Sequence, residues 1–271
     1  MILAAGRGER MRPLTDTTPK PMLQVHGKPL LQWPLEALVR AGVRDAVINT
    51  AWLGGQIARQ YGKYFDLEPS SNGIASLSNE ERIHIQYSNE EADFGSALET
   101  AGGIARAIAW LGDVFWLQAG DVFAPDFAFC QDAVEAFAAS DKLAHIWLVP
   151  NPEHKPDGDF GWTPLATSAT EGGPAECSNA TGLALDLPAA DPRPRLTYST
   201  IGLYRSALFA PPWCDIPAGN PHGVKAPLGP LLRAAMAQQK VSAEMYWGRW
   251  ADVGTPQRLQ QLHAAWLQPS A

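Results

Sequence analysis

Short apolar runs alternate with longer amphipathic stretches along the first half of the chain. The short runs lie at 2–4, 46–49, 83–87 and 114–118, and the longer stretches at 30–41, 55–64 and 103–111. The former have the length of buried strands and the latter the apolar spacing of helices. This alternation predicts a parallel sheet covered by helices on both faces, whose ligands bind at the carboxyl ends of the strands.

The second half continues with fewer clear helices. Apolar runs at 143–149, 182–187 and 198–204 predict further strands, and 228–238 and 256–267 predict closing helices. The last helix follows Thr255 and Pro256, a capping residue and a residue suited to a first turn. Two polar or Gly- and Pro-rich stretches, 66–82 and 167–195, are predicted to be surface insertions. We predict one α/β domain over 1–271, with halves at 1–125 and 126–271.

The overall composition is that of a soluble globular protein, because the 271 residues are 46% hydrophobic and 18% charged. The formal net charge is −7 and the 21 Lys and Arg residues form no basic stripe, which argues against nucleic acid as a partner. No apolar run is long enough for a signal peptide or a membrane span, so we expect no membrane partner and a cytoplasmic location. Because the first apolar run begins at residue 1, we expect the native start a few residues upstream.

A glycine-rich turn follows the first run. Small residues there let the backbone amides approach a polyphosphate closely; they are Ala4, Ala5, Gly6 and Gly8. Arg10 and Lys20, the latter in Pro-Lys-Pro, supply positive charge, although the Lys-Ser/Thr pair of a Walker loop is missing. The alternative is a simple Gly-rich turn between a strand and a helix.

Two aspartates follow apolar runs. Asp121 comes after Gly120, and Asp252 begins the segment Asp-Val-Gly-Thr-Pro. Two strand-end carboxylates match the oxygen ligands that Mg²⁺ prefers. The alternative for Asp121 is a cap on a helix beginning near Asp126.

Two further segments carry candidate binding residues. The amides and small residues at the start of the helix near 98–104 suit a nucleobase or ribose, which indicates Glu99, Thr100 and Gly103. A helix start capped by Thr100 is a compatible alternative. The bent, polar segment 149–161 suits the hydroxyls of a sugar, or it is a proline-studded surface turn. Its candidate residues are Asn151, Asp159, Phe160 and Gly161.

The pattern Gly-x-Gly-x-Arg-Met-x-Pro-x-Thr, followed by Pro-Lys-Pro, resembles the signature of the sugar-1-phosphate nucleotidyltransferase family. The resemblance implies a Rossmann-like, mostly parallel mixed sheet flanked by helices, with a smaller sugar-binding part: the nucleotide-diphospho-sugar transferase fold. It also implies that Arg10 and Lys20 bind phosphates, that Asp121 and Asp252 bind the metal, and that the loop at Glu99 recognises the base. Many members have Gly where this chain has Glu99.

Three motifs narrow the resemblance. Leu-Glu-Thr-x-Gly-Gly-Ile, Asn-Pro-x-His with Gly-Asp-Phe, and Trp-x-Asp-Val-Gly-Thr-Pro are most similar to the N-acetylmuramate α-1-phosphate uridylyltransferase branch, which serves peptidoglycan recycling. This similarity implies that N-acetylmuramic acid α-1-phosphate attacks the α-phosphorus of UTP, giving a UDP-sugar and pyrophosphate.

The same similarity implies which residues are catalytic and which parts of the chain bind each substrate. Arg10, Lys20 and Asp121 would be catalytic, and Mg²⁺ would be the cofactor. The half at 1–125 would bind the nucleotide and 126–271 the sugar phosphate. A monomer or small homo-oligomer is expected.

Two alternatives remain at this point. One is another enzyme of the family, a mannose-1-phosphate guanylyltransferase or a glucose-1-phosphate thymidylyl- or cytidylyltransferase, because base choice depends on few backbone contacts. The other is an inactive subunit that senses nucleotide sugars. The presence of all four charged site residues disfavours it, and these are Arg10, Lys20, Asp121 and Asp252.

Overall fold

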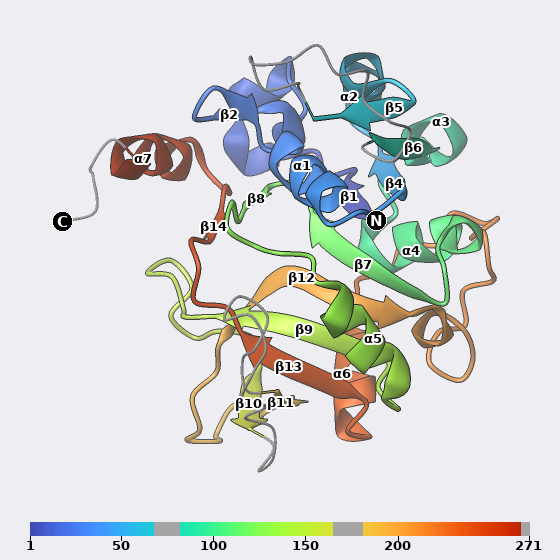
Figure 1. Ribbon diagram of the computed structural model, residues 1–271, viewed down its shortest axis with the longest axis vertical. Coiled ribbons are helices and arrows are strands. Elements are labelled where there is room, and N and C mark those ends of the chain that lie inside the picture. The colour runs from blue at the N-terminus through green and yellow to red at the C-terminus, as the bar shows by residue number, and fades with distance from the viewer. Residues whose placement is uncertain (68–81, 165–180, 267–271) are drawn as a thin grey trace. The chain divides into compact units, whose positions relative to one another are not determined.

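The computed structural model in Figure 1 describes residues 1–67, 82–164 and 181–266 of the chain. Its residues form two compact units that interleave along the sequence. Unit 1 comprises Met1–Leu98, Ala119–Phe129 and Arg249–Ala271, and unit 2 comprises Glu99–Gln118 and Cys130–Gly248. The predicted division of the chain into halves at 1–125 and 126–271 therefore differs from these two units. Most of the predicted insertion 66–82 and much of 167–195 lie outside the described residues.

Unit 1 contains the strand-and-helix alternation predicted for the beginning of the chain. Its main strands are β1 (Ile2–Ala4), β4 (Asp45–Thr50), β6 (Arg82–Asn89) and β5 (Tyr64–Asp66), neighbours in that order. β1, β4 and β6 are parallel, whereas β5 is antiparallel to β6. Residues 46–50 of β4 are all buried, as expected for a strand covered on both faces.

The helices of unit 1 are α1 (Gln32–Arg40), α2 (Gly54–Tyr61), α3 (Glu90–Phe94) and α7 (Pro256–Trp266), coloured from blue to red in Figure 1. Three of them, α1, α2 and α7, follow predicted stretches with small shifts of their ends, whereas the short α3 was not predicted. The backbone amide of Arg258 donates to the hydroxyl of Thr255 at 3.3 Å, so Thr255 caps α7 as predicted. Two short ribbons complete the unit: β2 (Gln24–Val25) with β3 (Lys28–Pro29), and β8 (Val122–Phe123) with β14 (Ala251–Asp252).

Unit 2 is built on mainly antiparallel strands. In spatial order they are β10 (Gly161–Pro164), β11 (Gly182–Leu185), β13 (Val241–Met245), β9 (Ala144–Val149), β12 (Thr197–Arg205) and β7 (Val114–Ala119). β13 and β9 run parallel, and the other neighbouring pairs run antiparallel. The helices are α4 (Glu99–Ala107), α5 (Gln131–Ala139) and α6 (Gly229–Ala237). No helix in the described part of the chain is long and apolar enough to cross a membrane.

Unit 2 contains elements that were not predicted, among them β10, α5 and β13. In α5 the buried side chain is that of Phe137, so the helix has no clear apolar stripe. In β13 small and polar residues separate the apolar ends, Val241 and Met245. α5 and β13 are stabilised by packing against other elements, which the local pattern of apolar residues does not indicate.

The turn after β1 is fixed by contacts around Gly8. Its φ is 68°, and a Cβ added there would lie 3.0 Å from Cγ2 of Thr15 and 3.2 Å from Cβ of Lys20. The hydroxyl of Thr15 donates to the carbonyl of Gly8 at 2.9 Å. The guanidinium of Arg7 lies 3.8 Å from the ring centroid of Trp52, and both side chains donate to the carbonyl of Thr15. The turn is therefore held in one conformation by its neighbours.

One apolar cluster joins the segments that carry the charged candidates of unit 1. Phe123 follows Asp121, Val253 follows Asp252, and Leu23 comes shortly after Lys20. The full cluster is Met11, Leu23, Val25, Leu30, Phe123 and Val253, with Trp33, Leu259 and Leu262 packed against it. Burial of these side chains therefore connects segments that are distant in sequence.

We expect Gly8→Ala to lower the free energy of unfolding by about 1–3 kcal/mol, because the new methyl group meets Thr15 and Lys20 in a left-handed conformation. Gly6→Ala is the matched control, since a Cβ at Gly6 meets nothing within 4 Å and its φ is outside the left-handed region. Urea denaturation of both variants would measure the difference. Equal stabilities would contradict the description of the turn.

We expect Phe123→Ala to cost about 3–5 kcal/mol of unfolding free energy, because the removed ring is 1% exposed and leaves a cavity. The control is Leu14→Ala in the same unit, where the side chain is 40% exposed and the expected change is within about 0.5 kcal/mol. Chemical denaturation followed by tryptophan fluorescence would compare the two. A Phe123 variant as stable as the control would show that the cluster does not support these segments.

Candidate active site

Lys20 and Asp121 form an ion pair within unit 1. Lys20 begins a 3-10 turn after Pro19, and its side chain is 12% exposed, against 36% for Asp121. Asp121 is positioned by Gly120, whose amide donates to the carbonyl of Leu3 in β1 at 2.8 Å. A Cβ on Gly120 would lie 3.0 Å from that carbonyl, so a glycine lets the two backbones approach. The predicted phosphate-binding lysine and metal-binding aspartate thus lie together beside the end of β1.

Asp252 lies on the strand next to the segment of Asp121. β14 pairs with β8 in antiparallel register, with Asp252 opposite Val122, and the amide of Val253 donates to the carbonyl of Asp121 at 3.2 Å. The two predicted metal-binding aspartates, far apart in sequence, are therefore on paired strands of unit 1.

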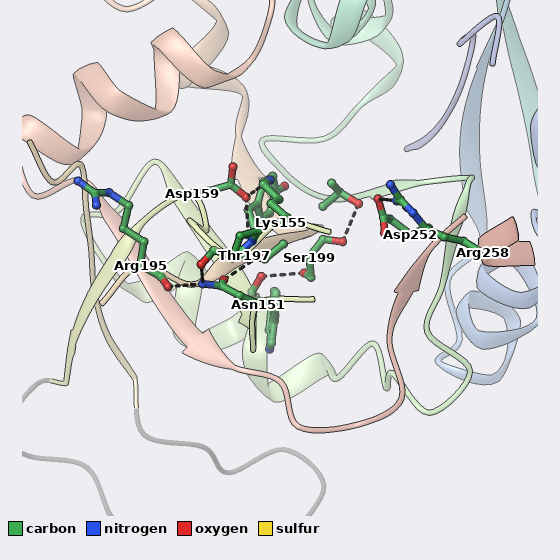
Figure 2. A network of polar contacts seen from close by, with 12 residues as sticks. Asn151, Lys155, Asp159, Arg195, Thr197, Ser199, Asp252 and Arg258 are labelled. Atoms are coloured by element: carbon green, nitrogen blue, oxygen red, sulfur yellow. Dashed lines mark hydrogen bonds and ion pairs between the residues drawn. The ribbon is translucent and has the colours of Figure 1, made fainter. Parts of the chain in front are cut away.

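Arg258 is a charged partner of Asp252 that the sequence did not reveal. Its guanidinium lies 2.6 Å from Oδ2 of Asp252, as Figure 2 shows. The Arg258 and Asp252 side chains are 20% and 33% exposed. A Cβ on Gly254 would lie 2.7 Å from Nη1 of Arg258, so the flexible end of the Arg258 side chain would have to shift to admit it. The sequence predicted a helix after Pro256, and this helix contains Arg258. The apolar spacing of a helix does not indicate that Arg258 pairs with Asp252.

These carboxylates fit a divalent cation. Both supply oxygen donors, and each is paired with a cationic side chain, Lys20 or Arg258, that a bound metal would compete with. In the described part of the chain no group of three or more His, Cys, Asp or Glu residues could by itself hold a metal. A cation here would therefore take its remaining ligands from water and phosphate oxygens, as Mg²⁺ commonly does.

The turn after β1 contains exposed backbone and one arginine, Arg10, that is not paired with another described residue. Ala4 and Ala5 are buried, whereas Gly6 is exposed. Arg10 is exposed and forms no hydrogen bond or ion pair with another described residue, so its charge is available to a ligand. Arg12, by contrast, is paired with Asp16 at 2.8 Å. Of these two arginines, Arg10 is therefore the one whose charge is not paired within the described residues.

A buried polar pair behind this turn was also missed. Asn49, at the end of β4, accepts a hydrogen bond from the amide of Ala4 at 3.0 Å and donates to Glu90 at 2.7 Å. Glu90 in turn accepts from the amide of Leu98 at 2.7 Å. Asn49 is 2% exposed and Glu90 is 0% exposed. In the sequence Glu90 stands in a polar run that favours a surface position, so its burial was not foreseen.

The start of α4 carries the candidates for base recognition, in unit 2. α4 begins at Glu99, which has a φ of 60° and is exposed, so Thr100 lies within the helix rather than before it. Gly103 is buried. The carbonyl of Ala226 accepts the amides of residues 101 and 102 at 2.8 and 3.1 Å. Those two amides therefore donate to the protein's own backbone rather than to a ligand.

Asn151 fastens the bent segment 149–161 of unit 2 to its neighbours, as Figure 2 shows. Its amide nitrogen donates to the carbonyls of Pro156 at 2.8 Å and Arg195 at 2.9 Å. Its oxygen accepts from the hydroxyl of Thr197 at 2.9 Å. The polar atoms of Asn151 thus fix the loop.

Asp159 keeps one acceptor atom unused. Its Oδ2 accepts from the amide of Tyr198 at 2.9 Å and from Lys155 at 2.5 Å. Within the described residues Oδ1 has no hydrogen-bond partner, and the side chain is 25% exposed. Phe160 is buried, and a Cβ on Gly161 would lie 2.5 Å from the side chain of Leu187. Of the four candidates for sugar binding, Asp159 is the one with a side-chain atom open to a ligand.

Comparisons with known proteins identify the relatives of this chain. The nucleotidyl transferase family matches residues 1–163. An N-acetylmuramate α-1-phosphate uridylyltransferase of Neisseria meningitidis serogroup B is 41% identical over 266 residues, 97% of this chain and 96% of that relative. An enzyme of the same name from Caulobacter vibrioides is 35% identical over 150 residues, 54% of this chain and 52% of its own length.

Solved structures show the fold. A Bacillus anthracis protein assigned as a glucose-1-phosphate thymidylyltransferase superposes with a TM-score of 0.69 at 18% identity, covering 100% of this chain and 95% of that one. An apo UDP-glucose pyrophosphorylase gives 0.68 at 15% identity, with 98% and 96% covered. The predicted fold class, a mixed sheet flanked by helices as in nucleotide-diphospho-sugar transferases, is confirmed. The chain therefore belongs to the nucleotidyl transferase family, among the sugar-1-phosphate nucleotidyltransferases, as its motifs predicted.

Proposed function

We propose that this enzyme transfers UMP from UTP to N-acetylmuramic acid α-1-phosphate, giving a UDP-sugar and pyrophosphate in cytoplasmic peptidoglycan recycling. The observation that carries the proposal is the 41% identity with the Neisseria meningitidis uridylyltransferase over 97% of the chain. The site supports it, because Lys20, Asp121 and Asp252 lie on adjoining segments beside a turn suited to phosphate. The substrates define a direct displacement that needs no covalent enzyme intermediate.

The side chains of unit 1 provide positioning and charge in this proposal. The turn after β1 offers backbone to the triphosphate, Arg10 neutralises the departing pyrophosphate, and Lys20 binds the phosphate that attacks. A Mg²⁺ ion held by Asp121 and Asp252 would supply positive charge to the phosphate oxygens. Lys20 is paired with Asp121 in the described structure, and its ammonium would bind a substrate phosphate when that carboxylate holds a cation instead.

The side chains of unit 2 provide recognition. We assign base and ribose contacts to the segment that contains Glu99, Thr100 and Gly103. Oδ1 of Asp159 is an acceptor suited to a sugar hydroxyl, whereas Asn151 would act by keeping the loop in shape. The two sugar-binding candidates Asn151 and Asp159 thus have different roles in the proposal.

We expect Asp121→Ala and Lys20→Ala to lower kcat by roughly 10²–10³-fold or more, since each removes a charge from the reacting phosphates. Lys28→Ala is the matched control, because Lys28 is paired with Glu36 at 2.7 Å and has no place in the proposed site. Pyrophosphate release would be measured, with circular dichroism to show that each variant is folded. Near-normal turnover in either site variant would refute the assignment.

Substrate profiling tests the proposed substrates directly. The protein would be incubated with UTP, ATP, GTP, CTP or dTTP against a panel of sugar 1-phosphates, and the nucleotide sugars detected by mass spectrometry. We expect UTP with N-acetylmuramic acid α-1-phosphate to give the highest kcat/KM. A preference for GTP with mannose 1-phosphate, or for dTTP or CTP with glucose 1-phosphate, would replace the proposal. Absence of turnover with every pair would indicate an inactive subunit.

A further inference from the structure

Three buried hydrogen bonds cross the carboxyl ends of neighbouring strands in unit 1. The amide of Ala4 in β1 donates to Oδ1 of Asn49 in β4, and Nδ2 of Asn49 donates to Oε1 of Glu90, which directly follows β6. Oε2 of Glu90 accepts from the amide of Leu98. We call these three bonds the Asn49–Glu90 relay. They lie at the edge where parallel sheets of this class bind ligands.

The relay joins two stretches of backbone that have a role in the proposed function. Ala4 opens the turn that faces the triphosphate, and Leu98 immediately precedes Glu99 and Thr100, the segment assigned to the base. Asn49 and Glu90 themselves are 2% and 0% exposed, so they are shielded from solvent in this structure. An action on the nucleotide would therefore pass through the backbone that they hold.

We propose that Asn49 and Glu90 are positioning residues for the nucleotide: the relay fixes the amides of Ala4 and Leu98 relative to one another, so that UTP meets a preorganised site. This inference rests on the proposed function. A preorganised site binds more tightly because less ordering is required when the ligand arrives. Loss of the relay should therefore weaken UTP binding more than sugar 1-phosphate binding.

The pattern of donors and acceptors in the relay is specific. Both oxygens of Glu90 accept, and Asn49 accepts at one end and donates at the other. In Glu90→Gln the new amide would meet either Nδ2 of Asn49 or the amide of Leu98, donor against donor. In Asn49→Asp the new oxygen would meet Oε1 of Glu90, acceptor against acceptor. Each single change keeps the shape of the side chain and breaks one bond.

The double variant Asn49→Asp with Glu90→Gln restores each of the three bonds of the relay. The amide of Ala4 would donate to one oxygen of the new aspartate, the new glutamine would donate to the other oxygen, and the glutamine oxygen would accept from the amide of Leu98. The charge moves by one residue and the side-chain volumes are preserved. The double variant therefore separates the hydrogen-bond pattern from residue identity.

The experiment measures steady-state kinetics with UTP and N-acetylmuramic acid α-1-phosphate, and UTP affinity by calorimetry without the sugar. We expect each single variant to raise the KM and Kd for UTP about tenfold, the effect of one unsatisfied buried group, while the KM for the sugar 1-phosphate stays within about twofold. The double variant should recover most of the UTP affinity. Glu91→Gln, a change of the exposed neighbouring carboxylate, is the control and should alter neither constant.

Several results would overturn the inference. Single variants that lose stability with an unchanged KM for UTP, or that do not fold, would show that the relay serves the fold alone. A double variant that folds and binds UTP no better than the single variants would show that the pattern of bonds is not what matters. Failure of the proposed function is distinguishable, because the unaltered protein would then give no turnover with UTP and this sugar 1-phosphate.

Discussion

Parallel pairing of β1, β4 and β6 brings the carboxyl ends of three strands to one edge of unit 1, and the polar groups of the site depend on that edge. The register places Ala4 beside Thr50, and Asn49 beside Ser88. Gly120 then hydrogen-bonds to the backbone of β1, which brings Asp121 to the same end. A shift of one residue in the pairing of β4 would move Asn49 away from the amide of Ala4 and from Glu90, and so separate these groups.

Local charge compensation explains how an acidic protein can present a phosphate site. The net charge of −7 repels anions at long range, so attraction must come from nearby groups. In the described structure Lys20 neutralises Asp121 and Arg258 neutralises Asp252, while Arg10 stays uncommitted. In the proposed reaction Asp121 and Asp252 would be the residues that hold the cation. The two ion pairs therefore keep the aspartates ordered without making the region strongly positive.

The two units use their polar side chains differently. In unit 1 buried groups support backbone that we assign to the nucleotide, as with Asn49 and Glu90. In unit 2 Asn151 and Oδ2 of Asp159 are used to shape a loop, which leaves Oδ1 of Asp159 as an acceptor. Many contacts of a substrate site thus serve to hold other residues in place, and only some would touch the ligand.

Much of the fold was predictable because helices and strands that are buried on one face or on both have a characteristic spacing of apolar residues. The early strands and helices were found within a few residues, and Thr255 was correctly predicted to cap α7. α5 and β13 were missed, since α5 buries the side chain of Phe137 without forming a clear apolar stripe, and polar residues interrupt the apolar positions of β13. The charged candidates Lys20, Asp121 and Asp252 could be named because each stands within two residues of a glycine or proline in a distinctive motif.

The sequence by itself determined the family, the alternation of strands and helices, and the residue types available for phosphate and metal. Only the tertiary structure decided which polar side chains are partners. Asn49 with Glu90, and Asp252 with Arg258, follow from strand register and helix orientation. Hydrogen bonds and ion pairs act over short distances, so small shifts of the backbone make or break them. Apolar burial tolerates such shifts, and the pattern of apolar residues is therefore easier to interpret from the sequence.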